Sequence, residues 1–236
     1  RLGIIGLPNS GKTTIFNALT GSNLETSAST SGQYEIHTAV VNVPDVRIDK
    51  LTAMYEPKKT IYATITYVDI GGLDKGISQG LKGEFRNQLQ SVDGFVHVIR
   101  AFEDDKVPHP YVNVDPARDL GIIDGEFLLS DLVAVENRLS KLQDELRIKG
   151  KKSEPMVLPE IELFERLKAH LEEEKPLRDL DLSADDIKAL RSYAFLTLKP
   201  VIVVINSGEE LTPVERIGAY EHRDSQVVAM QGQLEA

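Results

Sequence analysis

The 236-residue chain has a formal charge of −10 and no cysteine, and 41% of its residues are hydrophobic while 27% are charged. This composition is ordinary for a globular protein and excludes a disulfide scaffold, a zinc–thiolate site and wholesale disorder. No run approaches the roughly 18 apolar residues of a membrane-spanning helix, so we predict a cytoplasmic protein with no membrane partner. The acidic balance opposes nonspecific adhesion to nucleic acid, so we expect no DNA partner and only local contacts with RNA.

Apolar runs that alternate with helical segments predict an α/β sheet domain. Strands are expected at residues 2–5, 39–43, 63–68, 95–99 and 201–205. Helical patterns at 14–19, 49–55 and 81–91 separate several of these strands, which favours crossover connections and a Rossmann-like layered sheet. Residues 24–34 are rich in Ser, Thr, Glu and Gly, which predicts a loop at the place where a nucleotide switch would lie.

A helical region interrupts this pattern between residues 115 and 197. Spacings that alternate between four and three residues predict one apolar helix side, formed by Leu128, Leu132, Val135, Leu139, Leu142 and Leu146. After a basic turn and Pro155, a return helix is expected to present Ile161, Phe164, Leu167 and Leu171. An antiparallel helical hairpin inserted between 1–114 and 198–236 accounts for both patterns. Two surface helices lying on the core are the alternative.

The most informative motif is Gly6-Leu-Pro-Asn-Ser-Gly-Lys-Thr13, which matches G-x-x-x-x-G-K-[ST] and lies between a predicted strand and a predicted helix. Its glycines let backbone N–H groups turn inward, and the helix N-terminus adds partial positive charge beside bound phosphates. Lys12 is expected to reach the β- and γ-phosphates of a nucleoside triphosphate, and Thr13 to bind Mg²⁺. The contacts predicted from this loop are Pro8, Asn9, Ser10, Gly11, Lys12, Thr13 and Thr14.

A second motif, Asp69-Ile-Gly-Gly72, follows the strand expected to end at Val68. At the carboxyl edge of an α/β sheet, Asp69 can hold Mg²⁺ through water, and the Gly72 N–H can contact the γ-phosphate and couple the loop to hydrolysis. A plain strand-ending turn is the alternative. Leu73 stands where Ras-like hydrolases place a Gln that orients water, so we predict slow hydrolysis or a water positioned from elsewhere.

Asn206-Ser-Gly-Glu209 occupies the place of the N-K-x-D motif that reads guanine in this fold. Ser207 replaces the Lys, and Glu209 replaces the Asp with a side chain one methylene longer, which displaces the carboxylate from the guanine edge. We therefore predict that guanine specificity is lost. Asn206 can still bond to an adenine edge, or it can cap the turn after the strand.

In this order the motifs resemble the YchF / Obg-like ATPase family of P-loop proteins. The resemblance runs nearly end to end and is also carried by residues 43–51, 92–104, 114–119 and 198–200. It implies a Ras-like G-domain, a three-layer sandwich with an inserted helical hairpin, that hydrolyses ATP in preference to GTP and is associated with ribosomes. It also implies a small C-terminal TGS domain, which this chain is expected to lack.

The resemblance assigns roles to further residues. His109 has the spacing of a histidine implicated in hydrolysis, although its sequence context alone is that of a solvated loop residue. Phe102 matches a residue that packs near the base, although an aromatic residue after a strand is commonly part of the core. Asn9 occupies a position linked to potassium activation in some relatives.

Two segments depart from the family pattern. Gln33 stands where the family places a switch-loop Thr that binds magnesium, which leaves Thr30 as a displaced candidate. Near the base the family reads Ser-Ala or Cys-Ala, whereas this chain has Met230, Gln231 and Gly232, whose backbone could still contact the base.

Three functions are consistent with these motifs. The first is a slow Mg²⁺-dependent ATPase, and the second is a conventional GTP-binding switch. The third is a nucleotide-gated binding module with negligible hydrolysis, whose hairpin contacts a partner such as ribosomal RNA. The basic residues for that contact are Arg147, Lys149, Lys151 and Lys152, although a solvated turn is the commoner meaning of such a cluster.

Overall fold

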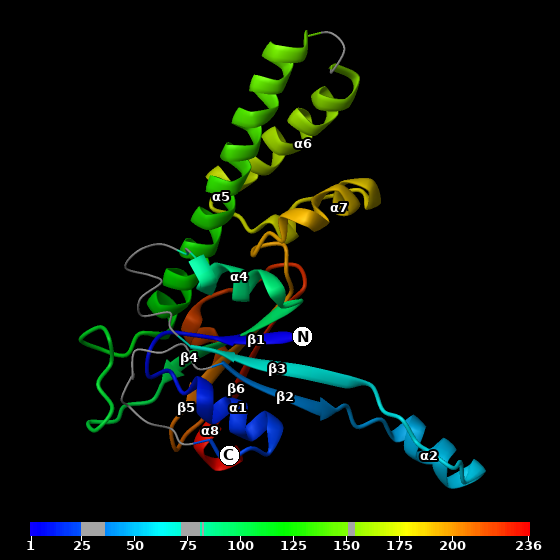
Figure 1. The fold of residues 1–236 in the computed structure, drawn as a ribbon. Helices are drawn as coiled ribbons and strands as arrows, with labels where there is room; N and C mark the ends of the chain where they lie inside the picture. The colour runs from blue at the N-terminus through cyan, green and yellow to red at the C-terminus, as the bar shows by residue number, and fades with distance from the viewer. Residues whose placement is uncertain (25–35, 72–80, 82, 151–153) are drawn as a thin grey trace.

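The computed structural model describes residues 1–24, 36–71, 81, 83–150 and 154–236, and its centre is a six-stranded sheet (Figure 1). The strands are β1 (Leu2–Ile5), β2 (Ile36–Asn42), β3 (Thr64–Ile70), β4 (Gly94–Ala101), β5 (Val201–Ser207) and β6 (Ser225–Met230). Their order is β2-β3-β1-β4-β5-β6, with β2 antiparallel to β3 and the other neighbours parallel. The predicted α/β sheet is confirmed, and β6 is a strand that the sequence did not predict.

Helices cover both faces of this sheet. The helix α1 (Lys12–Thr20) packs on one face through a buried cluster formed by Ile4, Ile15, Phe16, Val96, Val98 and Val204. The helix α4 (Gly83–Ser91) and the first turns of α5 (Pro116–Lys149) pack on the other face through Ile5, Phe85, Leu89, Phe95, Ile99, Leu120, Ile123 and Ile205. Since successive side chains of a strand point to opposite faces, neighbours such as Ile4 and Ile5 belong to different layers. The three-layer sandwich is confirmed.

The long helix α5 continues beyond the sheet and packs against the returning helix α6 (Glu154–Glu172), as Figure 1 shows. Short elements follow, namely η2 (Leu177–Asp179), α7 (Ala184–Leu190) and η3 (Arg191–Tyr193). The core of this region is separate from the sheet and contains Val135, Leu139, Leu163, Phe164, Leu167, Leu171, Leu177, Leu190 and Phe195. The predicted antiparallel hairpin and its apolar sides are confirmed.

The helix α5 belongs to both regions. Leu120, Ile123 and Phe127 lie in the core of the sheet, whereas Val135 lies in the core of the hairpin. A domain boundary at residue 115 therefore falls before the turns of α5 that cover the sheet. The division into 1–114 with 198–236 and 115–197 remains a proposal.

At the far end of β2, the helix α2 (Val46–Tyr55) extends away from the sheet and buries none of its residues (Figure 1). Asp45 caps it by accepting a hydrogen bond from the Arg47 N–H at 2.8 Å, so the chain turns shortly after the end of β2. The remaining short helices are η4 (Val214–Ile217) and α8 (Gly232–Glu235). Over the described residues, no helix is both long and apolar enough to cross a membrane.

Candidate nucleotide-binding site

The loop at residues 6–13 joins β1 to α1, and two of its glycines have no room for a side chain. A Cβ atom at Gly6 would lie 2.3 Å from the carbonyl oxygen of Val98. A Cβ atom at Gly11 would lie 2.2 Å from Nδ2 of Asn206, and the φ of Gly11 is 91°, a conformation that other residues rarely adopt. Close contact with β4 and β5 therefore explains both glycines of the motif.

Lys12 lies across its own loop. Its Nζ donates to the carbonyl oxygens of Gly6, at 3.1 Å, and Leu7, at 2.9 Å. The Ser10 hydroxyl is buried and has no hydrogen-bond partner among the described residues. The other predicted contacts, Pro8, Asn9 and Thr14, are partly exposed around the loop. The arrangement offers an ammonium group beside a curved backbone, which is the chemistry of a phosphate site.

Thr13 and Asp69 meet where a metal ion would be expected. The Thr13 hydroxyl donates to Oδ2 of Asp69 at 2.9 Å, and Asp69 lies in β3, one residue before the strand ends. Burial raises the pKa of Asp69 above its usual value, although the charge of Lys12 and the Thr13 hydrogen bond oppose the shift. Oδ1 of Asp69 is buried and, within the part of the chain that the structure describes, has no partner. A hydroxyl and an unsatisfied carboxylate oxygen fit Mg²⁺.

Asn206, the penultimate residue of β5, joins two loops. Its Nδ2 donates to the Ser10 carbonyl oxygen at 3.0 Å, and its Oδ1 accepts from the Gly232 N–H at 3.1 Å. The side chain is buried, so it holds the loop at residues 6–13 against the start of α8. The contact between Asn206 and an adenine edge stays a prediction.

The loop after β5 is held by Ser207 and Gln231. The buried Ser207 hydroxyl accepts from the Thr212 N–H at 2.9 Å, so this side chain turns back into its own loop. Nε2 of Gln231 donates to the carbonyl oxygens of Gly208, at 3.2 Å, and Glu209. The carboxyl ends of β5 and β6 are therefore tied together at the edge where α/β sheets bind ligands.

A hollow of about 370 Å³ opens at this edge beyond β4 and β5. Its lining includes Phe102, Gly208, Glu209, Leu211, Thr212 and Arg216. Met230 is not part of this lining, because it packs against the apolar cluster around α1.

The buried Arg100 connects the hollow to the loop at residues 6–13. Its guanidinium carbon lies 4.4 Å from the centre of the Phe102 ring, and its Nε donates to the Phe102 carbonyl oxygen at 3.0 Å. Its Nη1 donates to the Asn9 carbonyl oxygen at 3.4 Å. The sequence analysis missed Arg100, although a lone charged residue in an apolar strand was a signal for it.

His109 is held by the first turn of α5. Its Nε2 lies 2.9 Å from Oδ2 of Asp119, and the side chains of both residues are at most 5% exposed. The residue before it contacts the loop at residues 6–13, because Nδ2 of Asn9 donates to the Pro108 carbonyl oxygen at 2.9 Å. His109 is therefore not a solvated loop residue. The sequence analysis missed its partner Asp119.

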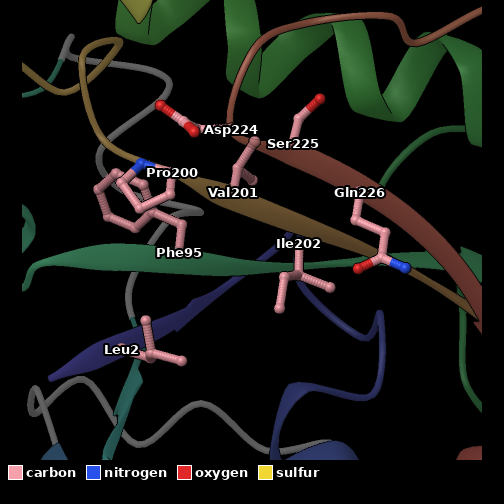
Figure 2. A pocket seen from close by; sticks show the side chains of 8 residues that line it. All are labelled: Leu2, Phe95, Pro200, Val201, Ile202, Asp224, Ser225 and Gln226. Atoms are coloured by element: carbon pink, nitrogen blue, oxygen red, sulfur yellow. The ribbon is translucent and has the colours of Figure 1, made fainter.

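A second hollow, of about 250 Å³, lies at the opposite edge of the sheet. Its lining includes Leu2, Phe95, Val201 and Ser225, which lie at the amino ends of β1, β4, β5 and β6 (Figure 2). It contains neither a glycine-rich loop nor any of the predicted site residues. The nucleotide site is therefore expected at the carboxyl edge.

Several predicted residues lie outside the described residues. These are Gly72 and Leu73 after β3, the switch-loop candidates Thr30 and Gln33, and the basic residues Lys151 and Lys152. Their roles stay predictions.

The strand order, the loop between β1 and α1 and the paired Thr13 and Asp69 define a P-loop nucleoside-triphosphate-binding fold of the Ras-like type. The family model described as "50S ribosome-binding GTPase" matches residues 1–158. The chain belongs to this family and, within it, to the YchF / Obg-like ATPase group.

Individual relatives agree with this assignment. "Ribosome-binding ATPase YchF" of Escherichia coli O157:H7 is 37% identical over 212 residues, which are 89% of this chain and 57% of that protein. "Obg-like ATPase 1" of Oryza sativa subsp. indica is 37% identical over 89% of this chain and 53% of its own length. The chain thus spans little more than half of these curated relatives. A solved structure, the Schizosaccharomyces pombe YchF GTPase, is 33% identical with a TM-score of 0.81 and covers all of this chain and 66% of its own.

Proposed function

We propose that the chain binds ATP with Mg²⁺ at the carboxyl edge of its sheet and hydrolyses it slowly, as a nucleotide-regulated factor that acts on the ribosome. The observation that carries this proposal is the loop at residues 6–13, in which the Thr13 hydroxyl meets the buried Asp69 carboxylate beside Lys12. This combination supplies the cation and the oxygen ligands that a magnesium-bound triphosphate requires.

Each residue of the loop has a separate role in this proposal. Lys12 exchanges its two backbone carbonyl partners for β- and γ-phosphate oxygens, and the backbone N–H groups at the start of α1 bind the phosphates. Thr13 would bind Mg²⁺ through its hydroxyl, and Asp69 would hold it through Oδ1 or through water. A metal ion held by these residues would supply positive charge beside the phosphates.

We expect the site to prefer ATP over GTP because of the residues that would surround the base. The names of the relatives disagree on this point, because some are called ATPases and the Schizosaccharomyces pombe protein is called a GTPase. Ser207 replaces the Lys of the guanine motif and turns into its own loop, and Glu209 replaces the guanine-reading Asp, so only the Asn of the motif is kept, as Asn206. We place the base at the hollow beside Phe102, close to the Gln231 contacts.

Hydrolysis is expected to be slow, and the test is phosphate release from Mg²⁺-ATP. Lys12→Ala should reduce release to background, because a phosphate-binding cation typically contributes several kcal/mol to the transition state. Lys58→Ala, at an exposed lysine between α2 and β3, is the matched control and should release phosphate at the wild-type rate. Equal release from the wild type and from Lys12→Ala would refute the ATPase.

The ribosomal role rests on the names of the relatives and on the basic end of the hairpin. Arg147 is 79% exposed there and pairs with Asp144 at 3.0 Å. Co-sedimentation with purified ribosomes, with and without ATP, tests this part. Arg147→Glu with Lys149→Glu should weaken co-sedimentation, whereas the same charge change at Lys58 and Lys59 should not. Equal binding by both pairs, in every nucleotide state, would contradict the proposal.

A further inference from the structure

The His109 ring has no nitrogen available for another ligand. Nε2 lies 2.9 Å from Oδ2 of Asp119, while Nδ1 lies 2.9 Å from the carbonyl oxygen and 3.0 Å from the nitrogen of Tyr111. A neutral ring donates to Asp119 and accepts from the Tyr111 N–H, and a protonated ring donates to both partners. In either protonation state, His109 cannot bind a water molecule or a phosphate through a ring nitrogen while these contacts persist.

Asp119 is itself held in place. Its Oδ1 accepts from Nε of Arg118 at 3.0 Å and from Nη2 at 2.7 Å. The same guanidinium donates to the side chain and the carbonyl oxygen of Asn113 and lies 4.9 Å from the centre of the Tyr111 ring. Asp119 also lies in the first turn of α5, where the helix dipole favours a negative charge. We name His109, Tyr111, Arg118 and Asp119 the histidine clasp.

The clasp lies next to the loop at residues 6–13. Nδ2 of Asn9 donates to the carbonyl oxygen of Pro108, so the peptide that leads into His109 is bonded to a residue of the loop at 6–13. Consecutive Cα atoms are about 3.8 Å apart, so the backbone of His109 lies close to the Pro108 peptide that contacts this loop.

We propose that Asp119 is a positioning residue that holds His109 away from the reacting phosphate, and that release of this contact permits hydrolysis. The inference rests on the proposed ATPase function and on the role in hydrolysis that the family resemblance implies for His109. If His109 can act only in the molecules in which its ring has left Asp119, the observed rate of hydrolysis is reduced to the fraction of such molecules. The clasp therefore contributes directly to a low basal rate. In contrast, loss of an ordinary structural contact would leave the rate unchanged or reduce it.

The test is phosphate release by the Asp119→Ala variant of the whole chain. A hydrogen bond to a charged group shifts the ratio of bonded to released molecules by roughly tenfold. Removing the bond to Asp119 should therefore raise the fraction of molecules with a released His109 ring, and with it the basal rate, by about tenfold. Asp119→Asn keeps an acceptor oxygen for Nε2 and should give a smaller rise, which preserves the test if Asp119→Ala does not fold. The rise should vanish when either variant is combined with His109→Ala.

The matched control is Asp115→Ala. Asp115 caps the same helix turn by accepting from the Arg118 N–H at 3.1 Å, and no contact between its side chain and His109 is seen. This variant loosens the start of α5 without removing the ring's partner, so it should leave the rate unchanged. A rise in this variant equal to that in Asp119→Ala would overturn the inference.

A direct readout is the rate at which diethyl pyrocarbonate modifies His109, followed by peptide mass spectrometry. Modification should be slow in the wild type and in Asp115→Ala, and several-fold faster in Asp119→Ala. An unchanged modification rate, or a phosphate-release rate that does not rise while the wild type remains active, would overturn the inference. A wild type with no Lys12-dependent release would instead refute the proposed ATPase, and the inference with it.

Discussion

The carboxyl edge of the sheet and the α5–α6 hairpin are held by different kinds of contact. At the edge, Gly11 has no space for a methyl group, and Asp69 is a buried carboxylate with one oxygen that has no partner among the described residues. In the hairpin, buried leucine and phenylalanine side chains pack together, and Arg138 bonds to both carboxylate oxygens of Glu160.

This difference indicates which properties each region controls. Burying an incompletely bonded carboxylate is unfavourable for folding, so the arrangement at the edge is explained by a ligand that satisfies it. The apolar core of the hairpin stabilises the fold through burial alone. Substitutions at the edge should therefore change nucleotide binding, and substitutions in the hairpin should change stability.

The largest effect is expected for Gly11→Ala. The added methyl group would lie 2.2 Å from Nδ2 of Asn206 and would displace the loop that binds the phosphates. Affinity for Mg²⁺-ATP, measured by titration calorimetry, should fall about 100-fold or more, since close backbone approach to the phosphates is lost. Gly121→Ala is the control, because a methyl group at Gly121 in α5 meets open space. Its affinity should be unchanged, and an equal loss in both variants would contradict the comparison.

An intermediate effect is expected for Leu167→Ala in the core of the hairpin. Leu167 is fully buried, so truncation should lower the free energy of unfolding by about 2–5 kcal/mol in urea titrations. ATP affinity of the folded protein should stay within about twofold of the wild type, because distant sites are usually independent. A large loss of affinity at a temperature where the variant is folded would show that the two regions are coupled.

A smaller loss in the free energy of unfolding is expected when the pH is lowered, and it should originate at His97 in the sheet. Burial, followed by the charge of Lys12, lowers the pKa of His97 from 6.5 to about 3. The unfolded chain therefore binds a proton between these values that the folded chain does not, so His97 destabilises the fold as the pH falls below 6.5. Between pH 7 and pH 5 this loss amounts to about 2 kcal/mol.

His97→Leu removes the titrating group and should flatten the pH dependence of urea unfolding by that amount. Leu167→Ala, which removes no titrating group, is the control in the hairpin and should keep the wild-type pH dependence. Equal slopes for the wild type and His97→Leu would show that His97 does not contribute to acid sensitivity.

Features that depend on local patterns were predictable from the sequence. The loop at residues 6–13 has a motif of fixed spacing, and the apolar sides of α5 and α6 repeat with helical periodicity. In contrast, the Asn206 side chain bonds to the backbone of Ser10, which is 196 residues away in the chain, and no local sequence pattern predicts such a contact. The sheet order alone brings them together, because the parallel strands β1, β4 and β5 end at one edge.

Other features were missed because a local pattern had two meanings. The strand β6 is only partly buried along its length, so its apolar alternation was weak. Asp119 is an ordinary acidic residue in the first turn of a helix until the fold places His109 beside it. The helix α5 continues without a break from the sheet into the hairpin, so no turn marks where one region ends.

The most direct test of this account is competition for the nucleotide site. Unlabelled ATP and GTP would be compared for displacement of fluorescently labelled ATP from the wild-type chain with excess Mg²⁺, and Lys12→Ala would serve as the background. With the Lys and the Asp of the guanine motif replaced by Ser207 and Glu209, ATP should displace the label at a concentration about tenfold lower than GTP. Equal or stronger displacement by GTP would contradict the assignment of this site to ATP.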